Sequence, residues 1–81
     1  MAREIEIRAR AEKELSKIPK RDATRIAEAI LALQGGLKGD IKKLTNHEPA
    51  YRLRVGDWRV LFDILPEKIV IQTIKNRRDA Y

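Results

Sequence analysis

The stretch YRLRVGDWRVLFDI, residues 51–64, alternates apolar side chains with arginines on both sides of a Gly-Asp pair. Glycine is favoured at the first position of a two-residue turn, so residues 56–57 predict a β-hairpin. Because side chains alternate along each strand, Arg54 is expected to lie directly opposite Arg59. One face of the hairpin is then entirely apolar, and the opposite face carries these two arginines and Arg52.

Like charges that face each other across a strand pair destabilise it by up to about 1 kcal/mol. A phosphate would remove this cost, because several guanidinium groups can share its oxygens. Further cations, expected to contact a nucleic-acid backbone, lie before the hairpin at Lys38, Lys42 and Lys43 and near the C-terminal end of the sequence at Arg78. We therefore expect the arginine face to bind an external anion, and RNA phosphate is the simplest candidate.

The remaining residues predict an α+β class of fold. Apolar positions at helical spacing indicate two helices separated by Pro19, which pack as an antiparallel helical hairpin. Glycines end the helical region, and the chain up to Pro49 is expected to be a loop. The first expected element is a short N-terminal strand at residues 4–7. The two helices are expected at residues 9–18 and 21–33, and a three-stranded antiparallel meander at residues 50–55, 58–65 and 68–75. We expect one domain, 1–81.

Strict alternation along the last predicted strand places Gln72 and Ile74 on the arginine face. Leu61 and Val70 are expected on the same face. Exposed apolar side chains beside a charged site favour a protein partner or a covering C-terminal segment.

Composition limits the classes of function. Eighteen Lys and Arg against 12 Asp and Glu give a formal net charge of +6, which favours nucleic acid, an acidic protein or anionic lipid as a partner. The chain has no cysteine and one histidine, which argues against disulfides and against thiolate or His-based metal sites. No apolar run reaches the length of a membrane span or forms a signal peptide. We therefore expect a cytoplasmic protein without a metal, another cofactor or a small-molecule ligand.

The run Y-R-x-R-x-G-D-aromatic-R, together with the terminal R-R-D-A-Y, resembles the RelE/ParE superfamily of bacterial and archaeal toxins, in particular its RelE-like branch. The resemblance covers essentially the whole chain. It implies the toxin of a type II toxin–antitoxin system, which an antitoxin protein holds inactive. It further implies a metal-independent endoribonuclease that cuts mRNA in the ribosomal A site, where the ribose 2′-OH attacks the adjacent phosphate.

By their positions in the motif, the catalytic residues that the resemblance implies are Arg52, Arg54, Arg59, Arg77 and Tyr81. Some members have lysine where this chain has Arg52 and Arg54, and some have histidine at the position of Asn76. An arginine does not lose its proton in a protein, so it can stabilise a phosphate but is a poor general base. The proton of the 2′-OH is therefore left to Tyr81, His47, a carboxylate or a group on the ribosome.

Two other functions fit the same fold. A ParE-like toxin would inhibit DNA gyrase by binding to it and would need no catalytic residues. A relative without activity is a further alternative, because the lysines are absent at positions 52 and 54. Arg59, Arg77 and Tyr81 together favour the ribonuclease.

Overall fold

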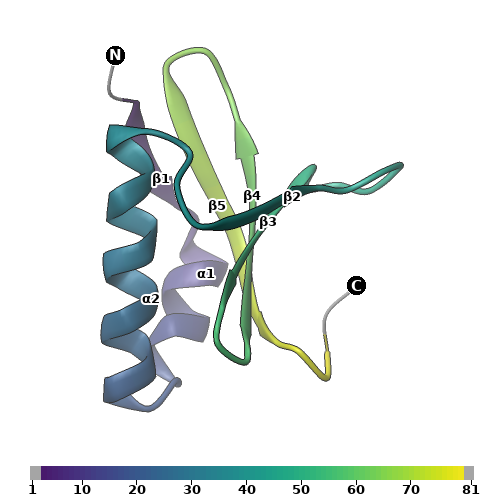
Figure 1. Cartoon of the computed structure of the whole chain (residues 1–81). Helices are drawn as coiled ribbons and strands as arrows, with labels where there is room; N and C mark the ends of the chain where they lie inside the picture. Colours follow the sequence, from purple (N-terminus) through teal and green to yellow (C-terminus); the bar gives the residue numbers. More distant parts are fainter. Residues whose placement is uncertain (1–2, 80–81) are drawn as a thin grey trace.

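The computed structural model describes residues 3–79, in which two helices cover one face of a five-stranded sheet (Figure 1). The helices are α1 (Ala9–Ser16) and α2 (Lys20–Ala32), and the short 3-10 helix η1 (Leu33–Gly35) follows α2. The strands are β1 (Glu4–Ile7), β2 (Asp40–Lys43), β3 (Tyr51–Val55), β4 (Trp58–Ile64) and β5 (Lys68–Asn76). The predicted α+β class is confirmed.

The strands follow the order β1-β5-β4-β3-β2 across the sheet. Strands β3, β4 and β5 form the predicted antiparallel meander, and the N-terminal strand β1 lies parallel to β5. Arg54 lies opposite Arg59, as the hairpin predicts, and Gly56 has a φ of 59° in the turn between them. This left-handed conformation suits glycine because a Cβ atom would make it strained.

Strand β2 corrects the prediction of a continuous loop up to Pro49. Residues Asp40–Lys43 pair antiparallel with β3, so that Ile41 lies opposite Leu53 and packs against the core. A single apolar residue among charged neighbours gives little signal in the sequence. It is sufficient in the structure because β2 is an edge strand and only one of its faces meets the core.

The core lies between the helices and the sheet. Helix α2 contributes Ile26 and Ile30, and η1 contributes Leu33, each at most 2% exposed. From the sheet, the buried side chains that meet the helices are Leu53, Val60, Phe62, Ile69, Ile71 and Ile74. Because both helices lie on this face, no helix of residues 3–79 covers the opposite face of the sheet, and we call it the open face (Figure 1).

A β-bulge in β5 changes which of its residues reach the open face. Ile71 lies opposite Phe62 and Thr73 lies opposite Leu61, so Gln72 is an extra residue without a partner on β4. The prediction that Ile74 lies on the arginine face is therefore wrong: Ile74 pairs with Val60 and is buried in the core.

Leu61 and Val70 are on the open face as predicted, but they are 3% and 6% exposed. The predicted exposed apolar patch is therefore wrong. Leu61 lies beside Arg52, whose long side chain is itself largely buried. A long arginine stem covers apolar surface in this way while its charged end remains available for polar contacts.

The edge of β5 beyond β1 is held by a side chain of α1. Oε1 of Glu14 accepts hydrogen bonds from the Thr73 hydroxyl at 2.6 Å and from the Ile74 amide at 3.0 Å. These contacts satisfy strand donors that β1 is too short to reach. Within the described residues no helix is long and apolar enough to cross a membrane.

Candidate functional site

Three cations lie side by side across the open face. Arg54 of β3 is the register partner of Arg59 of β4, and Arg59 is the partner of Lys75 of β5. We call these three residues the cation row. On the other side of Arg54, the edge strand β2 places Asp40. The row therefore crosses three strands and ends at one carboxylate.

Asp40 relieves part of the repulsion that the hairpin predicts. Its Oδ1 accepts a hydrogen bond from Nη2 of Arg52 at 3.0 Å, and its Oδ2 lies 4.0 Å from Nη1 of Arg54. Part of the repulsion is therefore relieved within the chain, and the binding of an external anion stays a prediction. One carboxylate offsets one charge, and the face keeps an excess of cations.

Arg52 is the most deeply placed of the arginines, with its side chain 14% exposed. Its Nε is buried and has no hydrogen-bond partner within the described residues. A buried polar group without a partner costs about 1–3 kcal/mol, more when charged, so it requires an explanation. A guanidinium has five N–H donors, so Arg52 can bind Asp40 through Nη2 and still have donors for a second oxyanion.

Arg59 is held by the backbone of its own turn. Its Nη1 donates to the carbonyls of Gly56 at 2.9 Å and Trp58 at 3.0 Å. The β3–β4 turn is also fixed to α2, because the indole Nε1 of Trp58 donates a hydrogen bond to Oδ2 of Asp22 at 3.2 Å. The side chain at the centre of the cation row is therefore preorganised by contacts that reach the helical layer.

The other predicted site residues within residues 3–79 lie before β2, on β2 and after β5. Arg77 and Arg78 follow directly after β5, and Nη1 of Arg77 lies 3.8 Å from Asp57 in the turn. Lys42 is the register partner of Arg52 on the open face; Lys43, the next residue, points the other way, and Lys38 precedes β2. Tyr81 lies outside the described residues.

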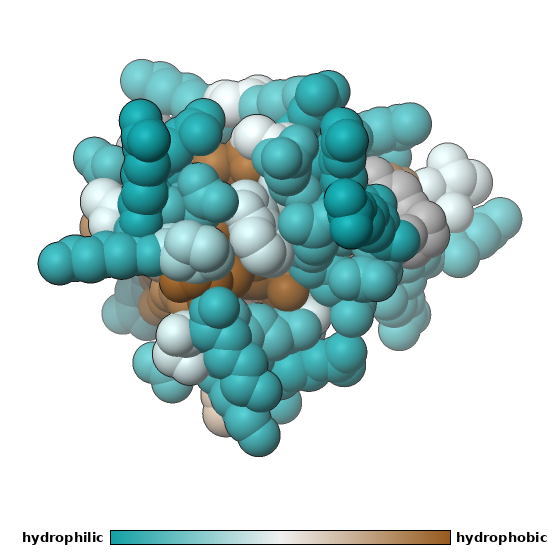
Figure 2. Space-filling model, turned by 90° about the horizontal axis from the view of Figure 1, so that it is seen from below, coloured by the Kyte–Doolittle hydropathy of each residue, from teal (hydrophilic) through white to brown (hydrophobic). Residues whose placement is uncertain are grey.

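Figure 2 views the molecule from the end that carries the β3–β4 turn, at the bottom of Figure 1. Hydrophilic side chains project around a small hydrophobic area on this face. This end of the molecule is therefore largely hydrophilic.

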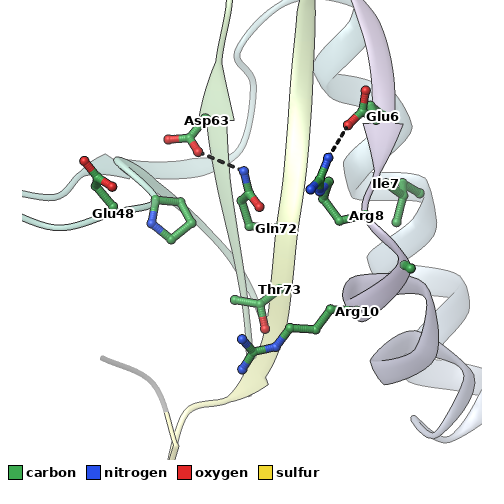
Figure 3. Close-up of a pocket in the computed structure, with 10 residues that line it drawn as sticks. Glu6, Ile7, Arg8, Arg10, Glu48, Asp63, Gln72 and Thr73 are labelled. Atoms are coloured by element: carbon green, nitrogen blue, oxygen red, sulfur yellow. Dashed lines mark hydrogen bonds and ion pairs between the residues drawn. The ribbon is translucent and has the colours of Figure 1, made fainter.

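A groove of about 820 Å³ also opens on the sheet and is drawn in Figure 3. It carries both signs of charge, and two of its three carboxylates, Glu6 and Asp63, already have partners. Asp63 accepts hydrogen bonds from the Ala50 amide at 3.0 Å and from Gln72 at 3.1 Å. Glu6 contacts Lys68 at 2.7 Å and Arg8 at 3.3 Å.

The hydrogen bond from Lys68 lowers the pKa of Glu6 below its ordinary value, and the hydrogen bond from Arg8 lowers it further. A carboxylate stabilised in its charged form is a poor general acid near neutral pH. Within residues 3–79, no three His, Cys, Asp or Glu side chains form a group that could hold a metal ion. The cation row, with its excess of positive charge, is therefore the stronger candidate site.

Sequence reasoning missed two residues of this site, Asp40 and Lys75. Asp40 is placed by a strand that was expected to be a loop, because Asp40–Lys43 has a single apolar residue and gives little strand signal. Lys75 is placed by the bulge. The signal for the bulge was the spacing of the buried isoleucines, which is two between Ile69 and Ile71 but three between Ile71 and Ile74.

Comparison with known proteins agrees with the fold and with the motif. A family model described as the ParE toxin of the type II toxin–antitoxin system parDE matches residues 5–81. A protein of Methanocaldococcus jannaschii named as toxin RelE1 is 32% identical over 83 residues, which cover 95% of this chain and 92% of that protein.

Two solved structures are also similar. The chain in the archaeal RelE–RelB complex from Pyrococcus horikoshii OT3 is 28% identical with a TM-score of 0.82, covering 99% of this chain and 100% of that one. The chain in the RelB–RelE antitoxin–toxin complex from Methanococcus jannaschii is 26% identical with a TM-score of 0.77, covering 90% of this chain and 91% of that one.

Proposed function

Because this chain belongs to the RelE/ParE superfamily of type II toxin–antitoxin toxins, we propose that it is a ribosome-dependent endoribonuclease that inhibits translation by cutting mRNA. The ribose 2′-OH attacks the adjacent phosphorus, and the bond to the 5′ oxygen breaks. The products are a cyclic phosphate and a free 5′-OH. The observation that carries the proposal is the row of cations on the open face, beside an arginine with a buried nitrogen that has no partner.

Arginines suit the electrostatic part of this reaction. The phosphorus passes through a five-coordinate state whose oxygens carry more negative charge than the ground state does. Preorganised guanidinium groups stabilise that charge, since they do not have to reorient during the reaction. We assign this role to Arg52, Arg54, Arg59 and Arg77.

The proton of the 2′-OH needs a different group, because guanidinium does not accept protons. We assign this step to Tyr81, which the motif places near the end of the arginine segment. In this role its phenolate form accepts the proton. A Tyr81→Phe variant that cleaves as fast as the parent would remove this role.

The partners follow from the same premise. The similar RelE structures are complexes with RelB, so we propose an antitoxin protein as the partner that holds this chain inactive. The net charge of +6 suits an acidic segment that folds on binding. The second proposed partner is a ribosome with mRNA in its A site, with Lys38, Lys42, Lys43 and Arg78 as additional RNA contacts.

The test is a cleavage assay in a purified translation system, in which mRNA 5′ ends are mapped with and without the protein. Arg59→Ala removes the centre of the cation row, and Arg21→Ala removes an exposed arginine of α2 as a matched control. We expect cuts within A-site codons that the control retains and that fall by about 10²-fold in Arg59→Ala. Circular dichroism shows whether both variants are folded.

Inhibition of DNA gyrase is the second candidate, and the description of the matching family model favours it. It predicts intact mRNA and loss of gyrase supercoiling, and Arg59→Ala would then act only through a protein interface. A protein that affects neither mRNA nor gyrase would instead be an inactive relative.

A further inference from the structure

We propose that Lys75 is a catalytic residue, the general acid that protonates the 5′ oxygen as it leaves phosphorus. This inference rests on the proposed ribonuclease function and assigns a step that the arginines cannot perform. An ammonium group carries a proton at neutral pH and can give it to an alkoxide, whereas a guanidinium retains its protons. The site needs such a donor, because an unprotonated alkoxide is a very poor leaving group.

The position of Lys75 follows from the register of the sheet. Lys75 lies opposite Arg59, which lies opposite Arg54, so its side chain is on the open face and in the same row. It is half-buried, and the following residues lead directly to Arg77. In a regular strand the side chain at position 75 would share the face of Ile69 and Ile71, which meets the helices. The bulge at Gln72 is what brings it to the arginines.

Lys75 is also available for chemistry. Its ammonium has no hydrogen-bond or ion-pair partner among residues 3–79, whereas Lys68 is held by Glu6 at 2.7 Å. The other open-face lysine near the site, Lys42, is exposed on the edge strand β2 and pairs with Arg52 in the next row. Lys75 is therefore the lysine that the register places beside the central arginine.

Two other titratable side chains outside the helices, His47 and Asp63, already have hydrogen-bond partners. Nδ1 of His47 lies 2.8 Å from the carbonyl oxygen of Pro49, which can only accept a hydrogen bond. The carboxylate of Asp63 accepts hydrogen bonds from Gln72 and from a backbone amide.

The step balances as follows. The 2′ oxygen forms its bond to phosphorus and its proton passes to Tyr81. The bond from phosphorus to the 5′ oxygen breaks, and the electron pair stays on that oxygen. A proton from Nζ of Lys75 converts it to the 5′-OH. The neutral amine then regains a proton from water, and Tyr81 gives up to water the proton that it took.

The experiment compares two synthetic mRNAs in programmed ribosomes, one with an ordinary A-site linkage and one with sulfur in place of the leaving 5′ oxygen. A thiolate leaves without protonation, so the sulfur substrate does not need a general acid. The key variant is Lys75→Arg, which keeps the positive charge but cannot give up a proton. Lys17→Arg, at the end of α1 on the helical side, is the matched control.

We expect Lys75→Arg to lose about 10²-fold on the ordinary linkage and to cut the sulfur linkage at the parent rate. Arg59→Ala should be slow on both linkages, because it affects the phosphate and not the leaving group. Equal losses on both linkages in Lys75→Arg, or no loss on either, would overturn the proposal. If the sulfur linkage restores the rate of a Lys42→Arg variant and does not restore that of Lys75→Arg, the proposal is overturned as well. A parent protein that cuts neither linkage would remove the proposed function itself, and the role of Lys75 with it.

Discussion

The substitution Asp40→Asn tests how the charge of the open face is balanced. The Asp40 carboxylate lies 3.0 Å from Arg52 and 4.0 Å from Arg54. A phosphate that approaches these arginines must displace the carboxylate or lie beside it. Two unit charges about 4 Å apart interact by roughly 1 kcal/mol where water screens them. Because Asp40 is 56% exposed, this screened value is the appropriate one.

Removal of about 1 kcal/mol of competition corresponds to an affinity roughly fivefold higher. We therefore expect Asp40→Asn to bind single-stranded RNA about five times more tightly at low salt. Stability should change in the opposite direction. Loss of the carboxylate leaves Arg52 and Arg54 without their ion-pair partner, at a cost of about 0.5–1 kcal/mol. For a domain of this size that corresponds to a decrease of roughly 2–8 °C in Tm.

Fluorescence anisotropy with a short RNA at 50 and 200 mM salt measures the first effect, and thermal unfolding measures the second. Glu28→Gln, on the exposed side of α2, removes the same charge away from the site and serves as the control. The difference between the two variants should shrink at the higher salt concentration because exposed charges are screened. If Asp40→Asn gains no more affinity than Glu28→Gln, Asp40 does not compete with phosphate and the reasoning is wrong.

Three further substitutions test the supports of the site. Glu14→Ala leaves the buried Thr73 hydroxyl and a strand amide without their acceptor, so urea denaturation should show a loss of about 2–3 kcal/mol. Gly56→Ala places a Cβ atom at a φ of 59°, which should lower the free energy of unfolding by about 1 kcal/mol or more. Glu6→Gln should lower Tm at pH 7, because a carboxyl group with a depressed pKa stabilises the folded state at pH values above its ordinary pKa of 4.5. The difference in Tm between the variant and the parent should vanish as the pH falls below 4.5 and through the lower folded-state pKa of Glu6.

The hairpin was predictable because its signals are local and mutually consistent. A Gly-Asp pair between two alternating runs defines the turn, and the turn defines the register of every facing pair. The prediction that Arg54 faces Arg59 is therefore confirmed in detail. The two helices were predictable for a similar reason, since their apolar stripes repeat at helical spacing over several turns.

Asp40 and Lys75 were not predictable from local pattern alone. Strand β2 has only four residues and one apolar side chain that meets the core, so its existence depends on pairing with β3. Lys75 depends on one extra residue in β5, and strict alternation assigned it to the wrong face. Both residues became visible only when long-range strand pairing was known, and both lie at the ends of the charged row.

The bulge in β5 shows why the site takes this form. In a regular strand that keeps the pairing of Ile69 and Ile71, Lys75 would lie against the helices and Ile74 would lie on the open face. Exposure of a buried isoleucine costs about 1.5–3 kcal/mol, and burial of an unpaired ammonium costs several kcal/mol more. An unpaired Gln72 costs far less, because its amide side chain donates to Asp63 at 3.1 Å. The bulge therefore completes the core with Ile74 and adds Lys75 to the arginines in one local change, so that packing of the core and assembly of the candidate site depend on the same residue.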